Sequence, residues 1–279
     1  PIRGGRSARN AMSATKMPRI TMRAGGDVTF LTRLGDDTFG AMAQQIWSDA
    51  GVRPEIRRGP NSETGAAYIF VDDETGDNAI IVCPGAATEI GSDDIDAWAA
   101  DIESAAIFMT QLEQPISAAV DALARAHAAG ATTIFNPAPA ATVPDTIWGS
   151  CSYVTPNETE ASELTGVPVD SVDSARRAGD KLLQMGAGTA LITLGEAGAL
   201  LHTKEGSEQI TTICNAPVVD TTGAGDAFNG GFAAALAEGR SPRDAALFGS
   251  ATAGIAVTRQ GTAGAMPSRA EIDAALARI

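Results

Sequence analysis

The chain has 279 residues, of which 44% are hydrophobic, and this length and composition are typical of one large α/β domain or two small ones. Its formal net charge of −14 argues against a nucleic-acid partner, although a single anionic nucleotide could still bind where the local charge is reversed. No apolar run approaches the roughly 18 residues of a membrane-spanning helix, so no membrane partner is expected.

Residues 1–22 are the least regular part of the chain. They are basic, contain no acidic residue and show no clean repeat of 2 or 3.6 residues. Pro18 would break a helix in this segment. An arginine-rich and acid-poor composition is also typical of a transit peptide. Regular elements are therefore expected only from about Asp27 onward.

The segment from residue 27 to residue 83 predicts a strand, a helix and a group of antiparallel strands. Val28–Leu31 is apolar and β-favouring, and a turn at Gly35 leads into a helix over 38–50. Looser alternation over 53–58 and 66–71, around a Gly-Pro-Asn turn, indicates antiparallel strands, and a further short strand is expected at 78–83. We expect these strands to form an appendage on the main sheet.

A repeated unit of apolar strand, polar turn and helix follows. The expected strands are 105–109, 132–135, 153–154 and 190–194, and the expected helices are 115–129, 157–164, 174–185, 242–258 and 268–279. Buried strands that alternate with helices predict a mostly parallel sheet covered on both faces. No break in composition marks a second domain. In such sheets ligands bind beyond the carboxyl ends of the strands.

The most informative stretch runs from Asp220 to Gly231 and reads DTTGAGDAFNGG. It predicts a glycine-rich turn between a strand and a helix, with Asp226 at the start of the helix. The N–H groups and the helix dipole at such a turn suit a phosphate or a developing anion. Two interpretations of Asp226 remain open at this point. It is either a general base for a substrate hydroxyl or an N-cap that only stabilises the helix.

Four further polar loops follow predicted strands. They are Gln111–Glu113, Asn136–Ala140, Thr155–Glu160 and Thr193–Gly198. Taken alone, each has an ordinary structural explanation: a solvated acid, a rigid proline-rich connector, a helix start and a hairpin turn. Their shared position at strand ends favours one composite site.

Cysteine and histidine usage limits the other chemistry that is open to the chain. Cys83, Cys151 and Cys214 are odd in number, far apart and without metal-ligand spacing, so we predict free thiols in a reducing, cytoplasmic compartment. There are only two histidines, so a histidine-based triad or a zinc site is not expected. Neither a G-x-x-x-x-G-K-[ST] loop nor a G-x-G-x-x-G motif after a strand is present, and this excludes P-loop and dinucleotide-binding classes.

Together these segments closely resemble the ribokinase-like carbohydrate kinases, and within that family its ribose-phosphorylating members. The resemblance extends from about Gly25 to the C-terminus. It implies a three-layer α/β/α fold with a mostly parallel central sheet and a small, incomplete β lid at about residues 53–71. It also implies one kinase domain over residues 1–279. The matching segments are Asn136–Ala140, Thr155–Glu160, Thr193–Gly198, Asp220–Gly231 and Ile255–Arg259.

The resemblance implies an enzyme that phosphorylates a sugar hydroxymethyl group with ATP, most directly D-ribose to D-ribose 5-phosphate. Asp226 matches the family's catalytic base, and the N–H groups of Gly223, Ala224 and Gly225 match its anion hole. Glu113, Gly4 and Gly5 match sugar contacts, beside Asp226. The positions that match nucleotide contacts are Asn157, Thr193, Leu194, Gly195, Glu196, Ala197, Gly198, Gly225 and Ser250.

The resemblance also implies two cations. Mg²⁺ would accompany ATP and be organised by Glu160, partly through water. A monovalent cation, K⁺ or similar, would activate the enzyme from a neighbouring site. The positions that match this second site are Asp220, Thr222, Ala256, Arg259 and Gly261, several of them through backbone carbonyls.

Residues 1–22 depart from the family pattern. The family's first strand, with its sugar-binding Asp, has no counterpart here, and Arg9 stands where an Asn belongs in the Gly4–Asn10 loop. We consider three explanations: a truncated or frame-disrupted start, a divergent native segment, and a transit peptide. The alternative functions are therefore a nucleoside or other sugar kinase and a nucleotide-binding protein with weak or no kinase activity. Members of this family often dimerise through the lid sheet, so the resemblance also implies a homodimer.

Overall fold

The structure is a computed structural model that describes residues 6–11, 16–59, 62–72, 78–214, 216–261 and 264–278. Within these ranges, six strands form the central sheet in the order β11-β10-β9-β8-β7-β6. Neighbouring strands from β6 to β9 pair in parallel, and β9, β10 and β11 pair antiparallel. Their bounds are β6 Ile107–Thr110, β7 Thr132–Phe135, β8 Tyr153–Val154, β9 Thr189–Thr193, β10 Ala199–Thr203 and β11 Gly206–Ile210.

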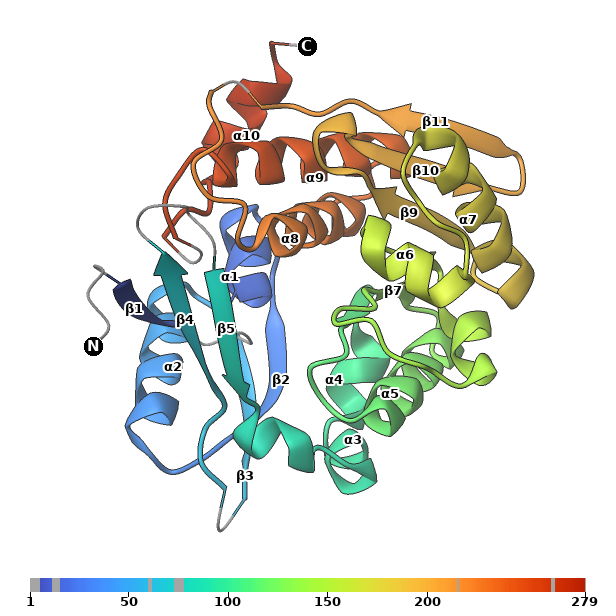
Figure 1. The fold of residues 1–279 in the computed structure, drawn as a ribbon. Coiled ribbons are helices and arrows are strands. Elements are labelled where there is room, and N and C mark those ends of the chain that lie inside the picture. The colour runs from blue at the N-terminus through green and yellow to red at the C-terminus, as the bar shows by residue number, and fades with distance from the viewer. Residues whose placement is uncertain are drawn as a thin grey trace.

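Helices cover both faces of this sheet, as Figure 1 shows. Side chains alternate along β9, so Leu191 packs into the core with α8 while Ala190 and Ile192 pack into the core with α7. The predicted three-layer α/β/α arrangement is confirmed. The helices are α5 Ile116–Ala128, α6 Glu158–Thr165 and α7 Val172–Met185 on one face, and α8 Ala224–Ala237, α9 Pro242–Ala256 and α10 Arg269–Leu276 on the other.

Glycines allow α8 to lie unusually close to its neighbours. A Cβ atom on Gly231 would lie 2.4 Å from the Thr252 hydroxyl oxygen of α9. A Cβ atom on Gly230 would lie 2.6 Å from the side chain of Ile20 in α1 (Lys16–Arg23). Since real Cβ atoms do not approach other atoms so closely, these glycines fix the position of α8 between α1 and α9.

The expectation for the strand over 53–58 is wrong. Strand β3 (Arg53–Arg58) pairs in parallel with β2 (Thr29–Leu34), in a separate two-stranded sheet. The physical reason is the helix α2 (Thr38–Asp49) between them, because a helical crossover returns the chain in the same direction. Residues 53–58 therefore lie outside the antiparallel sheet that was expected to include them.

A three-stranded antiparallel sheet does exist, in the order β1-β4-β5. Its strands are β1 Arg6–Ala11, β4 Ala66–Asp72 and β5 Asn78–Cys83. Strand β4 corresponds to the second half of the predicted lid. Gly4 and Gly5, which the sequence assigns to sugar binding, lie outside the described residues.

Two regular elements, β1 and α1, lie before residue 27, where the sequence predicted none. Helix α1 contains Pro18, although a helix break was expected there; Pro18 is the third residue of the helix, where backbone N–H groups have no intrahelical partner. The remaining helices are η2 Gly85–Glu89, α3 Ser92–Ala97, α4 Ala99–Ser104, η3 Asp145–Ser150 and η4 Gly195–Ala197. No helix in the described residues is long and apolar enough to cross a membrane.

Asp94 on α3 joins the two-stranded sheet to the rest of the molecule. Its carboxylate is 1% exposed and lies 2.9 Å from Arg33 Nε of β2 and 2.5 Å from Arg57 Nε of β3. Burial by itself raises the pKa of Asp94, but the hydrogen bonds and charges of Arg33, with the Gly91 N–H and Arg57, outweigh it and lower the pKa below 3.8. The buried carboxylate is therefore ionised and bridges two arginines.

We predict that Asp94→Ala lowers the free energy of unfolding by about 3 kcal/mol at neutral pH, because both arginines lose a buried partner. Since the pKa of Asp94 is lowered in the folded state, this difference should shrink as the pH falls below about 4. Urea unfolding from pH 7 to pH 3 measures both effects. The exposed neighbour Asp93 is the control, and Asp93→Ala should cost less than about 1 kcal/mol. Equal costs at the two positions would contradict this role of Asp94.

Candidate active site

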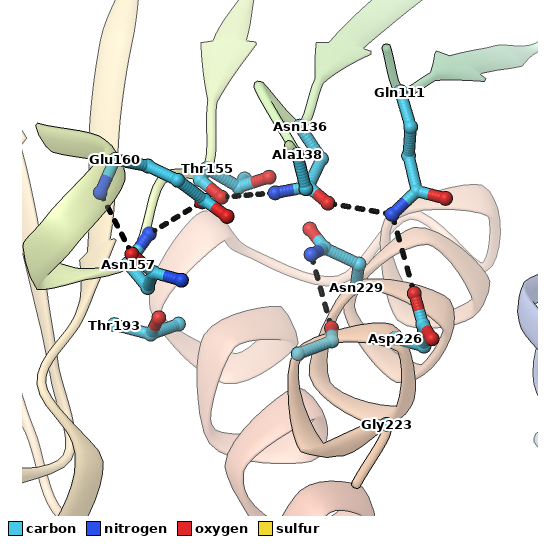
Figure 2. Close-up of a pocket in the computed structure, with 11 residues that line it drawn as sticks. Gln111, Asn136, Ala138, Thr155, Asn157, Glu160, Thr193, Gly223, Asp226 and Asn229 are labelled. Carbon is cyan, nitrogen blue, oxygen red and sulfur yellow. Dashed lines mark hydrogen bonds between the residues drawn. The ribbon is translucent and has the colours of Figure 1, made fainter. Parts of the chain in front are cut away.

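A pocket of about 190 Å³ lies where the carboxyl ends of the parallel strands meet the start of α8. Figure 2 shows how its side chains converge from the ends of β6, β7 and β8 above and from α8 below. In sheets of this kind ligands bind beyond the carboxyl ends of the parallel strands, so this is where a ligand is expected. The lining residues are Gln111, Asn136, Ala138, Thr155, Asn157, Glu160, Thr193, Gly223, Gly225, Asp226 and Asn229.

The start of α8 is open toward this pocket. Gly223 is the N-cap in a left-handed conformation (φ +79°), which favours glycine, and as a glycine it provides no side chain to cap the helix. Asp226 is the third residue of the helix, so its interpretation as an N-cap is wrong; the tight turn at Gly223 has already begun the helix. The first-turn N–H groups and the helix dipole thus make an anion-binding position beside a carboxylate.

Gly225 leaves space over this turn. A Cβ atom built on it would meet no heavy atom of the described residues within 4 Å. The glycine is therefore not required by packing at this position. Its effect is to leave room in the pocket for a bound group to approach the backbone.

Asn157 and Glu160 shape the opposite wall. Asn157 Oδ1 accepts a hydrogen bond from the Glu160 N–H (2.8 Å), and Glu160 Oε2 accepts one from the Asn157 N–H (2.9 Å). This capping box starts α6 and aligns both side chains. Burial raises the pKa of Glu160, and the negative charge of Asp226 raises it further. A cation between these carboxylates would reverse that effect.

The loop over residues 193–198 borders the pocket at Thr193. Gly198 has a positive φ of +90°, and a Cβ there would lie 2.0 Å from the Ile210 carbonyl oxygen, so the loop requires glycine. Ser250 does not line the pocket. Its hydroxyl donates to the Thr211 carbonyl (2.8 Å) and accepts from the Ile213 N–H (3.2 Å), so it holds the segment next to this loop.

Asp220 connects the two segments that the sequence assigns to a monovalent cation. One oxygen of its carboxylate accepts the Thr222 N–H (2.9 Å) and the other accepts the Gly261 N–H (3.0 Å). The Arg259 N–H donates to the Ala256 carbonyl (3.1 Å). The Arg259 guanidinium is directed elsewhere, at Glu271 and the Ala265 carbonyl. Any cation ligand from Arg259 must then be its carbonyl.

Glu113 is exposed and does not line the pocket, although Gln111, two residues earlier, does. The sequence assigned no role to the side chains of Gln111, Asn136, Thr155 or Asn229. The first three are the first polar residues after β6, β7 and β8, a signal that could have identified them. Asn229 lies one helical turn after Gly225, to whose carbonyl it donates (3.0 Å).

Two buried polar atoms in the pocket wall have no hydrogen-bond partner in the described residues. They are Thr155 Oγ1 and Asn229 Oδ1, in residues that are each 1% exposed. Buried polar groups in proteins are normally paired. These two atoms therefore indicate a pocket that a polar ligand or ordered water completes.

Comparison with known proteins gives consistent results. The model of the pfkB family of carbohydrate kinases matches residues 18–269. A ribokinase of Haemophilus influenzae is 34% identical over 96% of this chain and 85% of its own length. A deoxyribokinase of Salmonella typhi is 32% identical over 95% and 84%. The structure of Arabidopsis thaliana ribokinase complexed with ribose and ATP superimposes with a TM-score of 0.87 at 29% identity, over 95% of this chain and 86% of that one.

We predict that Gly225→Ala weakens ATP binding without lowering the stability of the protein. Alanine favours a helix over glycine by about 0.5–1 kcal/mol, and no atom obstructs the added methyl group, so the melting temperature should be unchanged or slightly higher. The methyl group should weaken the binding of ATP at least about 10-fold, or 1.4 kcal/mol, as measured by titration calorimetry.

Gly149→Ala is the matched control, because its Cβ also meets no atom within 4 Å but Gly149 does not line the pocket. It should leave ATP affinity unchanged. A folded Gly225→Ala protein with normal ATP affinity would show that the phosphates do not bind over this turn.

Proposed function

The chain belongs to the pfkB family of carbohydrate kinases, and we propose that it transfers the γ-phosphoryl group of ATP to the 5-hydroxyl group of D-ribose. Similarity to the H. influenzae ribokinase over most of both chains supports ribose as the acceptor. Likeness to the A. thaliana ribokinase that holds ribose and ATP supports ATP as the donor. The observation that carries the proposal is the position of Asp226 in the pocket at the open start of α8.

Asp226 is the general base in this proposal. Its carboxylate accepts the proton of the 5-hydroxyl as that oxygen bonds to the γ-phosphorus and the bond from the γ-phosphorus to the leaving oxygen of ADP breaks. The N–H groups of Gly223, Ala224 and Gly225 stabilise the charge on the transferring phosphoryl group. Phosphoryl transfer depends mainly on positioning and electrostatics, so a carboxylate beside an anion-binding helix start suits this reaction.

Mg²⁺ accompanies ATP in the proposal, and the chemistry of the pocket fits it. Glu160 and Asp226 are two carboxylates lining one pocket, and burial, together with the charge of Asp226, raises the pKa of Glu160. Within the described ranges no group of three His, Cys, Asp or Glu side chains could hold a metal. Mg²⁺ typically needs only one or two carboxylates, with waters and substrate phosphates as its other ligands. Glu160 would hold the ion through water, and the ion would neutralise phosphate charge.

The nucleotide contacts in this proposal come from Asn157 and the segment Thr193–Gly198. Ser250 contributes indirectly, by holding the segment 211–213. Within that segment, Thr212 Oγ1 donates to the Glu196 carbonyl (2.8 Å). We assign sugar contacts to Asp226 and, in the loop after β6, to Glu113.

We further propose a monovalent cation, K⁺ or similar, beside the anion hole. The ligands would be the Asp220 carboxylate and nearby backbone carbonyls of Thr222, Ala256, Arg259 and Gly261. Asp220 links both segments through its hydrogen bonds to Thr222 and Gly261, which supports this arrangement. Turnover that rises when K⁺ replaces Na⁺ at constant ionic strength would support the cation, and turnover indifferent to K⁺ would refute it.

Cytoplasmic residence and homodimerisation are part of the same proposal. Cys83, Cys151 and Cys214 are all free thiols, as expected in a reducing compartment. A dimer formed through the β1-β4-β5 sheet would pair exposed strand surface, since Ile81 and Val82 of β5 are 55% and 59% exposed. Size-exclusion chromatography with light scattering tests the dimer, and a monomer at micromolar concentration would refute it.

A second candidate is a kinase for a related sugar. The 32% identity with the S. typhi deoxyribokinase favours 2-deoxyribose as the alternative acceptor. A protein that binds nucleotide without phosphorylating sugar is a further alternative, because Arg9 stands where the sugar-binding loop of the family has an Asn. The three functions differ in what stimulates ATP turnover.

We predict that ribose stimulates ATP turnover and that Asp226→Asn lowers kcat by about 10²–10⁴-fold, the usual contribution of a general base. A coupled assay for ADP, with ribose, 2-deoxyribose, a nucleoside or no acceptor, measures this. ATP affinity should be nearly unchanged in the variant, since the N–H groups over the first turn of α8 remain.

Asp180→Asn is the control for loss of a carboxylate, because Asp180 lies outside the pocket and pairs with His202. It should keep normal turnover. ATP binding without stimulation by any acceptor would favour the binding-only function. If only 2-deoxyribose or a nucleoside stimulates turnover, that compound is the acceptor instead of ribose, and the proposed mechanism is unchanged.

A further inference from the structure

Gln111 is the side chain that links the end of β6 to the proposed base. It is the first residue after β6 and lines the same pocket as Asp226. Its Nε2 atom lies 3.2 Å from Asp226 Oδ1 and donates a hydrogen bond to it. The two residues are 115 positions apart in the chain, so this bond ties the central sheet directly to α8.

The same amide group of Gln111 is also hydrogen-bonded to the residues that follow the neighbouring strands. Nε2 also donates to Asn136 Oδ1 (2.8 Å), after β7, and Asn136 Nδ2 donates to the Thr155 carbonyl (2.6 Å), after β8. Figure 2 shows this chain as a line of dashed bonds from Thr155 to Asp226. The ends of three adjacent parallel strands thus each contribute one group to it.

The donor and the acceptor of every hydrogen bond in this series follow from the Thr155 carbonyl, at which the series begins. A backbone carbonyl can only accept, so Thr155 requires the NH₂ group of Asn136 to face it. Asn136 Oδ1 then faces Gln111 and requires an NH₂ donor there, and an ionised Asp226 requires the same donor. The two hydrogens of Gln111 Nε2 satisfy both acceptors, and a carboxylate at position 111 could satisfy neither.

The strands do not need these side chains to keep their register. Backbone bonds already join the same loops, from the Leu112 N–H to the Ala138 carbonyl, from Asn136 to Thr110 and from Thr155 to Phe135. The additional amide chain ends on the one carboxylate to which the proposed function assigns the chemistry. This indicates a role in the reaction rather than in folding.

We propose that Gln111, oriented by Asn136, is a positioning residue that holds the ionised carboxylate of Asp226 in place for proton transfer; this rests on the proposed function. A hydrogen bond to the charged form favours that form, and in a partly buried pocket its effect is larger than in water. Among the described residues that line the pocket, Glu160 on α6 is the other titratable side chain, and its negative charge opposes ionisation of Asp226.

The test compares Gln111→Glu with Gln111→Met. The glutamate places a second carboxylate against Asp226, so the acid limb of the pH profile of kcat/KM should move up by at least about one unit. At high pH kcat should stay below that of the unchanged protein, because an ionised glutamate donates no hydrogen bond to Asp226. The methionine removes the donor at similar size, so kcat should fall about 10–100-fold, with unchanged KM for ATP and unchanged melting temperature, as for other groups that orient a reactive side chain.

Gln114→Met is the matched control in the same loop. Gln114 Nε2 donates to Thr110 Oγ1 (2.8 Å) and to the Gln111 carbonyl (2.6 Å), and Gln114 does not line the pocket. It should leave kcat and the pH profile nearly unchanged. Equal effects of Gln114→Met and Gln111→Met, or a Gln111→Glu profile that does not move, would overturn the proposal.

A measurement without activity distinguishes failure of this inference from failure of the proposed function. Carboxyl ¹³C NMR titration of Asp226 should give a higher pKa in Gln111→Glu than in the unchanged protein. If no sugar stimulates turnover but this pKa still rises, the proposed function fails and the contact of Gln111 with Asp226 stands. If turnover is normal and the pKa is the same in both proteins, only the inference on Gln111 fails.

Discussion

The position of the first turn of α8 is the constraint on which the rest of the site depends. Residues 227–235 of this helix are all buried, and Gly230 and Gly231 let it pack directly against α1 and α9. Because the helix cannot shift without a clash, its N-terminal N–H groups remain directed at the ends of the parallel strands. The carboxylate of Asp226 and the proposed phosphate position are therefore fixed together by packing well below the pocket.

The electrostatics of the pocket are local and differ from those of the whole molecule. The chain carries a net charge of −14, and two carboxylates line the pocket, yet the proposed ligand is a polyanion. The helix start supplies partial positive charge at one side. On the other side burial, and to a smaller extent the negative charge of Asp226, raise the pKa of Glu160. A pocket of this kind holds ATP when a divalent cation accompanies it, which is why Mg²⁺ and the nucleotide belong to one proposal.

The sequence alone predicted the alternating strands and helices, the two-faced sheet and the glycine-rich turn, because each depends on short patterns within one segment. The strand expected directly before that turn is wrong, since residues 216–220 form no strand and Val218 and Val219 are exposed. The sequence did not predict the parallel pairing of β3 or the helix around Pro18, since β3 pairs with a strand across α2 and the tolerance of proline depends on its place in the first turn. Of the two interpretations of Asp226 that the sequence left open, the N-cap is wrong because the left-handed turn at Gly223 already begins the helix. Gln111 was missed because its partners, Asn136 and Asp226, are distant in the chain and only the fold brings them together.

The central claim is that a sugar hydroxyl and the γ-phosphate of ATP meet between Asp226 and the open start of α8. A crystal structure with ribose, Mg²⁺ and a non-hydrolysable ATP analogue tests it most directly. We expect the 5-hydroxyl oxygen within about 2.6–3.2 Å of an Asp226 carboxylate oxygen and the γ-phosphate over the N–H groups of Gly223, Ala224 and Gly225. A γ-phosphate bound away from this turn, or a sugar whose hydroxyl groups do not reach Asp226, would contradict the account.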